Sequence, residues 1–264
     1  MPSIRDAFNN AAVNYNKHAL IQTEIAFRTD QKLDLIRPNN KTILDLGSGT
    51  GLLTDRILSR FPKSQIISID FAHNALLKNK AKTKICADTN KLPIKDNSAD
   101  IIVSSLMMQW CPDLNKFFVE CFRVLKNDGL ILFSTFGPDT LKELKKSWSV
   151  VDDKDHVNNF IDMHDIGDQL LNNGFQDTVM EMENIVVNYK AVVELLRDIK
   201  GIGAQTVMHR SKSLTGKSMF TSMIKMYESY RKDGMIPATY EVVYGHAWKK
   251  TSSPGYISIN YENL

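Results

Sequence analysis

Cysteine is scarce in this chain of 264 residues, and metal-binding spacings are absent from its sequence. Cys86, Cys111 and Cys121 form no C-x-x-C pair and, being three, cannot all form disulfides with one another. Reduced thiols are typical of the cytoplasm, so we predict a cytoplasmic protein. The six histidines show no H-E-x-x-H or comparable spacing. We therefore expect no metal.

Long apolar runs are also lacking. No run approaches the roughly 20 residues that are needed to cross a bilayer, and residues 1–14 are polar and mixed in charge. We therefore expect neither a secretory signal nor a membrane partner. The composition, 43% hydrophobic and 24% charged, is typical of a soluble globular protein with enough apolar material for a core.

The net charge of +3 conceals an uneven distribution. Residues 137–194 carry 5 Lys and Arg against 12 Asp and Glu, whereas residues 195–250 carry 10 against 4. Each charge taken singly is most simply a solvated surface group, but the basic stretch as a block would attract an acidic partner. No basic run with interleaved aromatic residues is present, so nucleic acid is not an expected partner.

Apolar strand-like segments alternate with helical ones along the chain. The expected strands are residues 42–47, 65–70, 84–88, 99–106, 129–136, 177–188 and 239–248. Helical spacing is found in residues 1–40, 50–60, 73–81, 115–126, 165–173 and 190–232. Strands of nearly continuous Ile, Val and Leu are typical of parallel sheets that helices cover on both faces.

This pattern predicts an α/β fold, a Rossmann-like doubly wound and mostly parallel sheet of seven strands. We expect a single domain over residues 1–264, with no repeats. Within it, residues 1–40 would form an N-terminal helical cap, and 41–189 with 236–250 the Rossmann-like core. Residues 190–235 would form a helical lid inserted between the last two strands, and 251–264 a polar tail.

The most informative stretch is Thr42 to Thr54, which reads T-I-L-D-L-G-S-G-T-G-L-L-T. An apolar strand ends in Gly47, Gly49 and Gly51, and a helical pattern follows at once. Strand, glycine turn and helix together form a nucleotide site at the carboxyl edge of a first strand. Glycine admits backbone angles that are closed to other residues and lets a ligand approach the main chain.

The residues around this loop favour S-adenosylmethionine over a nicotinamide dinucleotide. The loop reads G-x-G-x-G, with Asp45 two residues ahead, instead of G-x-G-x-x-G. Asp70 and Phe71 at the end of the second strand suit a ribose and an adenosine, but they would suit NAD as well. The loop A-D-T-N-K-L-P at 87–93 discriminates, because Asp88 can accept from an adenine amino group while the Thr89 N–H meets a ring nitrogen.

In this order and spacing, residues 40–136 resemble the class I methyltransferase family. The motifs that carry the resemblance are I-L-D-L-G-S-G-T-G, Asp70, A-D-T-N-K-L-P and L-K-N-D-G-L-I-L. It implies S-adenosylmethionine as cofactor, with S-adenosylhomocysteine as product. The implied cofactor residues are Asp45, Gly47, Ser48, Gly49, Asp70, Phe71, Asp88, Thr89, Ser105 and Leu106, with Gln22 from the N-terminal helices. For Tyr15 and Gln22, purely local hydrogen bonding is the alternative to closing the pocket.

Further strings resemble the malonyl-acyl-carrier-protein methyltransferase family of biotin synthesis. They lie at residues 8–15, 106–111, 133–148, 156–170, 198–204, 213–217 and 237–248, and so span nearly the whole chain. The resemblance implies methyl transfer to the free carboxylate of malonyl-acyl-carrier protein, giving the methyl ester that starts pimeloyl synthesis. The implied partner is an acyl carrier protein that carries malonyl-phosphopantetheine.

The implied reaction requires no general base, because a carboxylate is already anionic at neutral pH. We assign no residue to that role, and Tyr15, Gln109 and Trp110 are candidates for positioning only, with core packing as the alternative for Trp110. Candidates for binding the malonyl carboxylate are His156, Arg197, Lys200, Arg210 and Lys217, which one sequence does not rank. We expect the basic block of residues 195–250 to form part of the carrier-protein docking face.

Two other functions are compatible with parts of this pattern. One is methylation of a free dicarboxylic acid such as aconitate, which would have no use for a basic docking surface. The other is that of a complex I assembly-factor relative that acts on a protein partner. The Q-W-C string at 109–111 and the H-V-N-N-F string at 156–160 favour the carrier-protein enzyme over this second alternative.

Overall fold

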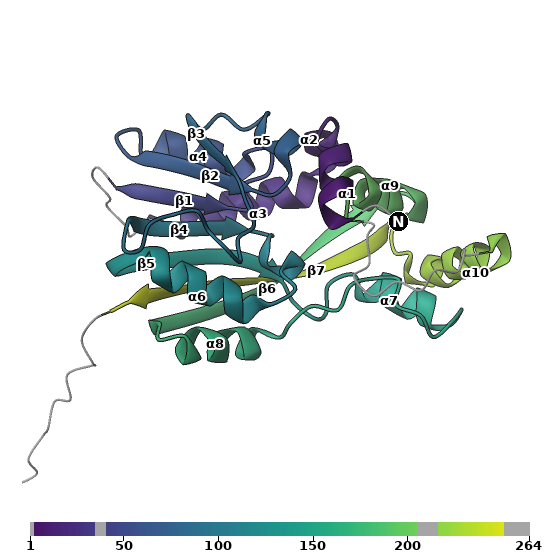
Figure 1. Cartoon of the computed structure of the whole chain (residues 1–264). Coiled ribbons are helices and arrows are strands. Elements are labelled where there is room, and N and C mark those ends of the chain that lie inside the picture. The colour runs from purple at the N-terminus through teal and green to yellow at the C-terminus, as the bar shows by residue number, and fades with distance from the viewer. Residues whose placement is uncertain (1–2, 35–40, 205–215, 251–264) are drawn as a thin grey trace, which may run out of the picture.

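The computed structural model describes residues 3–34, 41–204 and 216–250 (Figure 1). Its sheet has seven strands in the order β3-β2-β1-β4-β5-β7-β6, and β7 runs antiparallel to both of its neighbours. The predicted α/β doubly wound fold is thereby confirmed. The strands are β1 (Thr42–Leu46), β2 (Gln65–Asp70), β3 (Thr83–Cys86), β4 (Ala99–Ser105), β5 (Leu125–Phe136), β6 (Gln176–Tyr189) and β7 (Ile236–Lys249).

Apolar side chains on both faces of the central strands hold the two helical layers. In β1, Ile43 belongs to the core cluster under α3 (Leu20–Gln31) and α4 (Leu52–Arg60). Its neighbour Leu44 belongs to the cluster under α6 (Leu114–Val124) and α8 (Met163–Asn172). Successive residues of a strand point to opposite faces, so a continuous apolar run supplies both cores.

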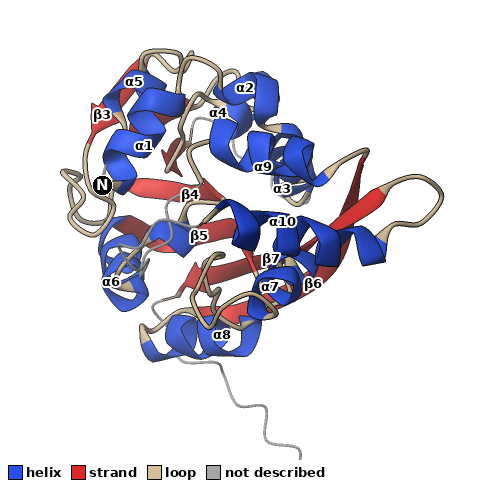
Figure 2. Cartoon of the chain, turned by 90° about the vertical axis from the view of Figure 1, so that its right-hand side faces the viewer, coloured by secondary structure: helices blue, strands red, loops and turns tan. Residues whose placement is uncertain are grey.

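A third core lies beyond the carboxyl ends of β5 and β6, where the insertion packs. Helices α9 (Val192–Gly201) and α10 (Lys217–Tyr227), followed by η2 (Glu228–Tyr230), come between β6 and β7 and meet α7 (Lys142–Ser149). Leu195, Tyr227 and Trp148 are buried in this cluster together with Ile25 of α3. Figure 2 looks onto this edge and shows α9 and α10 in front of the sheet.

The first forty residues form separate helices within the described part. Helix α1 (Ile4–Ala11) begins with a capping box, because the Ser3 and Asp6 side chains each accept from the other's backbone N–H. It is followed by α2 (Tyr15–His18) and α3. Helix α1 contacts α5 (His73–Leu76), so it lies beside the end of β2.

The structure corrects two of the predicted elements. The helix expected at 73–81 is the short α5, because the chain turns so that the buried Asn79 side chain donates to Thr54 Oγ1 at 2.9 Å. Strand β5 begins at Leu125, not at 129, since Leu125 pairs with Ala99 before a bulge. Helix α7 was not expected, and Leu141 before it takes a positive φ of 55°. The predicted tail at 251–264 lies outside the described residues.

None of the described helices combines the length and the apolar character that a bilayer-spanning helix requires. Among residues 3–34, 41–204 and 216–250, no three His, Cys, Asp or Glu side chains gather in a way that would hold a metal ion.

Candidate active site

Three adjoining cavities lie at the carboxyl edge of the sheet. The outer cavity, about 220 Å³, is lined by Phe8, Phe71, Asp88, Thr89 and Trp110 among others. The inner cavity, about 40 Å³, is lined by residues that include Asp45, Ser48, Gln22 and Ser105. The apolar cavity, about 380 Å³, is lined mainly by Phe136, Leu144, Trp148, Phe160 and Leu196 with their neighbours.

The glycine loop forms the floor between the outer and inner cavities. Gly47 and Gly49 take positive φ values of 70° and 51° and line both cavities. A Cβ on Gly49 would meet no atom of residues 3–34, 41–204 or 216–250 within 4 Å, its chain neighbours aside. Packing within the protein does not require a glycine there, so the missing side chain leaves open space that a ligand can enter.

Asp70 joins the glycine loop to the end of β2. Its Oδ2 accepts from the Gly49 N–H at 2.8 Å, and its Oδ1 accepts from the Ala72 N–H at 2.7 Å. Each carboxylate oxygen has a second lone pair, so Asp70 can still accept from ribose hydroxyls. Burial raises the pKa of Asp70 above its usual value, against the lowering effect of the backbone donors.

Asp45 lies beneath the loop and is 1% exposed. Its Oδ2 accepts from the Thr54 hydroxyl at 2.5 Å, and Thr54 in turn accepts from Asn79. Burial raises the pKa of Asp45 to about 7, although the Thr54 hydrogen bond opposes the rise. Asp45 therefore both supports the turn and lines the inner cavity.

The cavities contain polar atoms that no group in the described part of the chain satisfies. In the described residues, Gln22 Oε1, Ser48 Oγ and Asn90 Oδ1 are buried without a hydrogen-bond partner. Gln22 and Ser48 line the inner cavity, and Asn90 lines the outer one. Unpaired buried polar atoms cost free energy, so they are typical of a site that a polar ligand completes. This set of donors and acceptors fits a molecule with an amino acid end and a nucleoside end.

Aromatic rings and Tyr15 close the outer cavity from the N-terminal side. Phe8 lies edge-on to Trp110 with ring centroids 5.1 Å apart, and it is tilted against Phe71 at 6.2 Å. Tyr15 lines both the outer and the inner cavity. Burial, with the negative charge of Asp70, raises the pKa of Tyr15 well above its usual value. The Tyr15 hydroxyl therefore stays protonated and can donate.

Leu106 follows β4 at the junction of the outer and inner cavities and has a positive φ of 53°. A leucine in this conformation costs about 1–2 kcal/mol, so its surroundings must hold it there. Its N–H donates to the Ser134 carbonyl at 2.9 Å, and its carbonyl accepts from Gln109 Nε2 at 2.8 Å. Gln109 is fixed at its other end by the Thr135 hydroxyl, which donates to Gln109 Oε1 at 3.1 Å.

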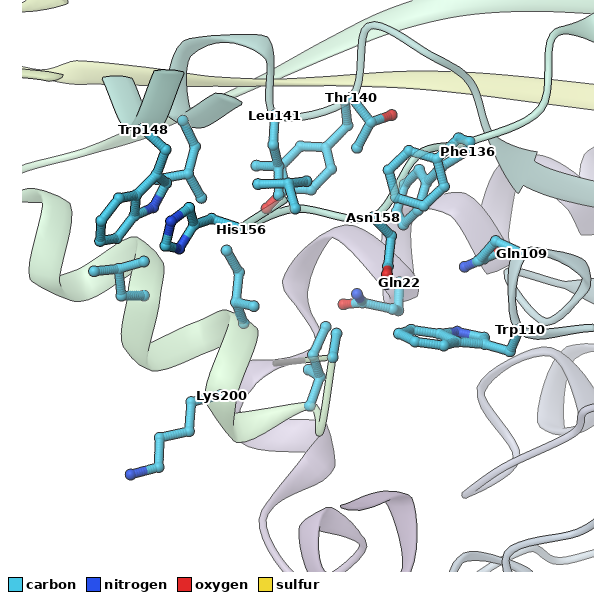
Figure 3. Close-up of a pocket in the computed structure, with 18 of the residues that line it drawn as sticks. Gln22, Gln109, Trp110, Phe136, Thr140, Leu141, Trp148, His156, Asn158 and Lys200 are labelled. Atoms are coloured by element: carbon cyan, nitrogen blue, oxygen red, sulfur yellow. The ribbon is translucent and has the colours of Figure 1, made fainter. Parts of the chain in front are cut away.

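The apolar cavity has amide groups at one end and a stacked ring pair at the other. Figure 3 shows Gln22 facing Asn158, with Gln109 and Trp110 beside them. At the far end His156 stacks on Trp148, with ring centroids 3.7 Å apart, and His156 Nε2 lies 2.8 Å from Asp152 Oδ1. Of the predicted carboxylate-binding residues, His156 therefore lines the cavity with one ring nitrogen already engaged.

The other predicted cations are distributed over the insertion. Lys200 lines the apolar cavity, and Figure 3 shows its ammonium group directed away from the amide end. Arg197 and Lys217 are exposed and do not line the cavity. Arg210 lies outside the described residues. The structure therefore brings His156 and Lys200 to this cavity, at the end opposite Gln22.

Several lining residues were missed by the sequence analysis. They include Phe8, Asn90 and Met107 of the outer cavity and Phe136, Asn158 and Tyr240 of the apolar cavity. Phe8, Asn158 and Tyr240 stand in strings that carry the family resemblance. That resemblance was the only signal in the sequence that pointed to them, because they come from α1, the loop after α7 and β7, and converge only on folding.

The fold and a family model agree on the class of protein. Residues 44–133 match the model described as a methyltransferase domain. YcgJ of Bacillus subtilis superposes with a TM-score of 0.62 at 14% identity, over 87% of this chain and 99% of that one. A Haemonchus contortus phosphoethanolamine N-methyltransferase 2 in complex with S-adenosyl-L-methionine gives 0.60 at 17% identity, over 95% and 61%. The protein is a class I S-adenosylmethionine-dependent methyltransferase.

Relatives at higher identity narrow this class. A Gallionella capsiferriformans protein named malonyl-[acyl-carrier protein] O-methyltransferase is 43% identical to this chain, over 94% of this chain and 90% of the relative. A Nitrosospira multiformis protein of the same name is 42% identical, over 93% of this chain and 88% of the relative. One from Coxiella burnetii is 40% identical over 99% of this chain and 92% of the relative. The chain belongs to the malonyl-[acyl-carrier protein] O-methyltransferase family.

Proposed function

We propose that this protein transfers a methyl group from S-adenosylmethionine to the free carboxylate of malonyl-acyl-carrier protein, forming the methyl ester that starts pimeloyl synthesis for biotin. The observation that carries the proposal is the contact between cavities. Trp110 lines both the apolar and the outer cavity, and Gln22 lines both the apolar and the inner cavity. The apolar cavity therefore adjoins the other two at these residues. An acyl group in the apolar cavity therefore reaches the cofactor.

The predicted cofactor residues line two different cavities, and we assign each group of residues to a different part of the cofactor. Asp88 and Thr89, with Phe71, line the outer cavity, where the adenosine would lie, and Asp70 of the same cavity would accept from its ribose hydroxyls. Asp45, Ser48 and Ser105 line the inner cavity, where the methionine end would lie. When bound, S-adenosylmethionine supplies an electrophilic methyl group: a carboxylate oxygen forms the new C–O bond as the C–S bond breaks, and sulfur keeps the electron pair.

The residues of the site provide placement and exclusion of water. A carboxylate is already deprotonated at neutral pH, so its methylation requires no general base, and we assign none. Trp110, Phe136 and Tyr240 give the cavity an apolar wall, which strengthens the attraction between an anionic acyl group and a cationic methyl donor. Placement of the oxygen within about 3–3.5 Å of the methyl carbon would supply most of the rate.

The shape of the apolar cavity favours a carrier-bound acyl group over a free dicarboxylic acid. Its volume of about 380 Å³ is larger than a small diacid fills. Its lining of Leu144, Leu196 and Ile199 is apolar, whereas a diacid is charged at both ends. A phosphopantetheine arm can pass between α9 and α7 and use this surface. We place the carrier-protein docking face on the basic insertion, beside Lys200. We further propose that the protein acts in the cytoplasm.

The test is mass spectrometry of malonyl-acyl-carrier protein after incubation with S-adenosylmethionine. A mass gain of one CH₂ unit, absent when acetyl replaces malonyl, supports the proposal. Turnover of free malonate or aconitate at the same rate would favour the small-diacid alternative. Rescue of a biotin auxotroph separates the proposal from a complex I assembly role, and failure to rescue despite expression of folded protein would contradict it.

A further inference from the structure

Gln22 of α3 stands at the boundary between the space for the methyl donor and the space for the acyl group. It lines the inner cavity together with Asp45 and Ser48, and it lines the apolar cavity together with Asn158 and Trp110. Among the described residues, no other side chain lines both of these cavities. A group in this position can contact two different ligands at once.

The Gln22 amide is buried without the partner that a buried amide normally has. Gln22 is only 7% exposed, and its Oε1 accepts no hydrogen bond from the described residues. The neighbouring amide of Gln109 provides the contrast, since Leu106 and Thr135 engage both of its ends. Gln109 is therefore a fixed wall, whereas Gln22 carries an unmet acceptor that points to a ligand.

The two ends of an amide differ in chemistry, and so do the two cavities. The carbonyl oxygen accepts hydrogen bonds, and the NH₂ group donates two. The α-ammonium group at the methionine end of the cofactor is a donor, and a malonyl carboxylate is an acceptor only. One glutamine at the boundary can thus serve both ligands without changing its protonation.

We propose that Gln22 bridges the two substrates, with Oε1 accepting from the α-ammonium group of the methyl donor and Nε2 donating to the acyl carboxylate. The second half rests on the proposed methylation of malonyl-acyl-carrier protein; the first half does not. The carboxylate is then held at the amide end of the apolar cavity by neutral donors. His156 and Lys200 lie at the other end of this cavity.

Neutral donors suit this reaction better than a cation would. Methyl transfer cancels the negative charge of the carboxylate against the positive charge of the sulfonium. A lysine paired with the carboxylate would stabilise the charged ground state and lose that interaction in the transition state. An amide orients the oxygen while leaving most of its charge available to the methyl carbon.

Two substitutions separate the two halves of the proposal. Gln22→Met keeps length and burial but removes both acceptor and donor, so S-adenosylhomocysteine binding, measured by calorimetry, should weaken about tenfold. Its kcat/KM for malonyl-acyl-carrier protein should fall by about 100-fold, since both contacts are lost. Gln22→Glu keeps the acceptor, so its S-adenosylhomocysteine affinity should stay within about twofold while kcat/KM still falls about 100-fold by charge repulsion.

Melting of the ligand-free protein distinguishes ligand binding from a structural role. Because Gln22→Met removes an unmet acceptor, the ligand-free variant should melt no lower than the wild type, and S-adenosylhomocysteine should raise its melting temperature less. Gln31→Met is the matched control, a glutamine that is exposed on the same helix, and both affinity and activity should be unchanged.

Each half has its own contradicting result. Wild-type affinity of Gln22→Met for S-adenosylhomocysteine would overturn the acceptor role, as would a lower melting temperature with an unchanged ligand-induced shift. Wild-type kcat/KM in Gln22→Glu would overturn the donor role. If the wild-type protein does not methylate malonyl-acyl-carrier protein, the proposed function and the donor half fail together, while the calorimetry still decides the acceptor half.

Discussion

His18 Nδ1 lies 2.9 Å from Asp198 Oδ1, which joins α2 beside the outer cavity to α9 beside the apolar cavity. Both side chains are partly buried at this contact, with 25% and 30% of their surface exposed. Tyr189 and Tyr240 are buried in one core cluster with Val192 and Leu195 of α9, and Tyr240 lines the apolar cavity. The His18–Asp198 contact therefore ties the N-terminal helices to the insertion beside the proposed acyl site.

The glycine at the end of α9 allows this contact. A Cβ on Gly201 would lie 2.3 Å from the His18 ring, so Gly201→Ala should push α9 away from α2. We expect kcat/KM for the acyl substrate to fall about tenfold, because the cavity wall formed by Ile199 and Ile202 moves. S-adenosylhomocysteine affinity should change less.

Gly167→Ala on α8 is the control for this substitution. Its Cβ would make only an ordinary contact of 3.5 Å with Met180, and alanine favours a helix by about 1 kcal/mol over glycine. Activity should be retained and stability should not fall. Equal kinetics of the two variants would show that the α2–α9 contact does not shape the site.

The buried Asp45 predicts a pH dependence of stability. At pH values between the ordinary aspartate pKa of 3.8 and the folded-state pKa of about 7, the folded protein holds a proton that the unfolded chain releases. This contribution to stability is complete below the unfolded pKa and is lost as pH rises toward about 7, with a limiting slope of about 1.4 kcal/mol per pH unit.

Asp45→Asn removes this titration. Urea unfolding of the ligand-free proteins at about pH 5 and about pH 8 should therefore show that the variant gains stability relative to the wild type as pH rises. A stability difference that is the same at both pH values would contradict the assignment. Thr54→Val tests the same network without changing a charge.

Gly49→Ala should weaken cofactor binding without unfolding the protein. Beyond the neighbouring residues, no atom of the described chain lies within 4 Å of the added methyl group, so the cost to folding is the strain of a positive φ, about 1–2 kcal/mol. The methyl group occupies the shared floor of the outer and inner cavities. We expect S-adenosylhomocysteine affinity to fall at least about tenfold by calorimetry, and unchanged affinity would refute this placement.

Lys200→Glu tests the docking face. If the basic insertion attracts the acidic carrier protein, KM for malonyl-acyl-carrier protein should rise several-fold at low salt, and the difference should shrink as salt rises. S-adenosylhomocysteine affinity should not change. Lys63→Glu, an exposed lysine in the turn before β2, is the control for the altered net charge. A KM equal to that of the control would place the carrier protein elsewhere.

The sequence was most reliable where structure is local. Residues 42–60 form the predicted strand, glycine turn and helix, and the later strands follow along the chain in the predicted sequence. Both predictions depend on spacing within short segments. The ends of elements were less predictable. Asn79 ends α5 early through a bond to Thr54, twenty-five residues away in sequence, and Leu125 extends β5 through pairing with β4.

The ranking of the predicted carboxylate-binding residues also depended on long-range packing. Arg197 and Lys200 stand one turn apart on α9, yet of these two Lys200 lines the apolar cavity. The packing of α9 against α2 decides which face of the helix borders the cavity. The assigned roles of both residues, and the division of the chain into cap, core, lid and tail, stay predictions.

The sequence by itself thus determined the fold class and the methyl donor, because a glycine turn and its flanking acids act within one strand–helix unit. The family resemblance added the acyl substrate as an expectation. Only the tertiary structure showed that the apolar cavity adjoins the other two at Gln22 and Trp110, which come from α3 and from the 3₁₀ helix Met108–Trp110 after β4. Long-range packing of helices on the sheet edge brings them together, and short-range spacing carries no record of it.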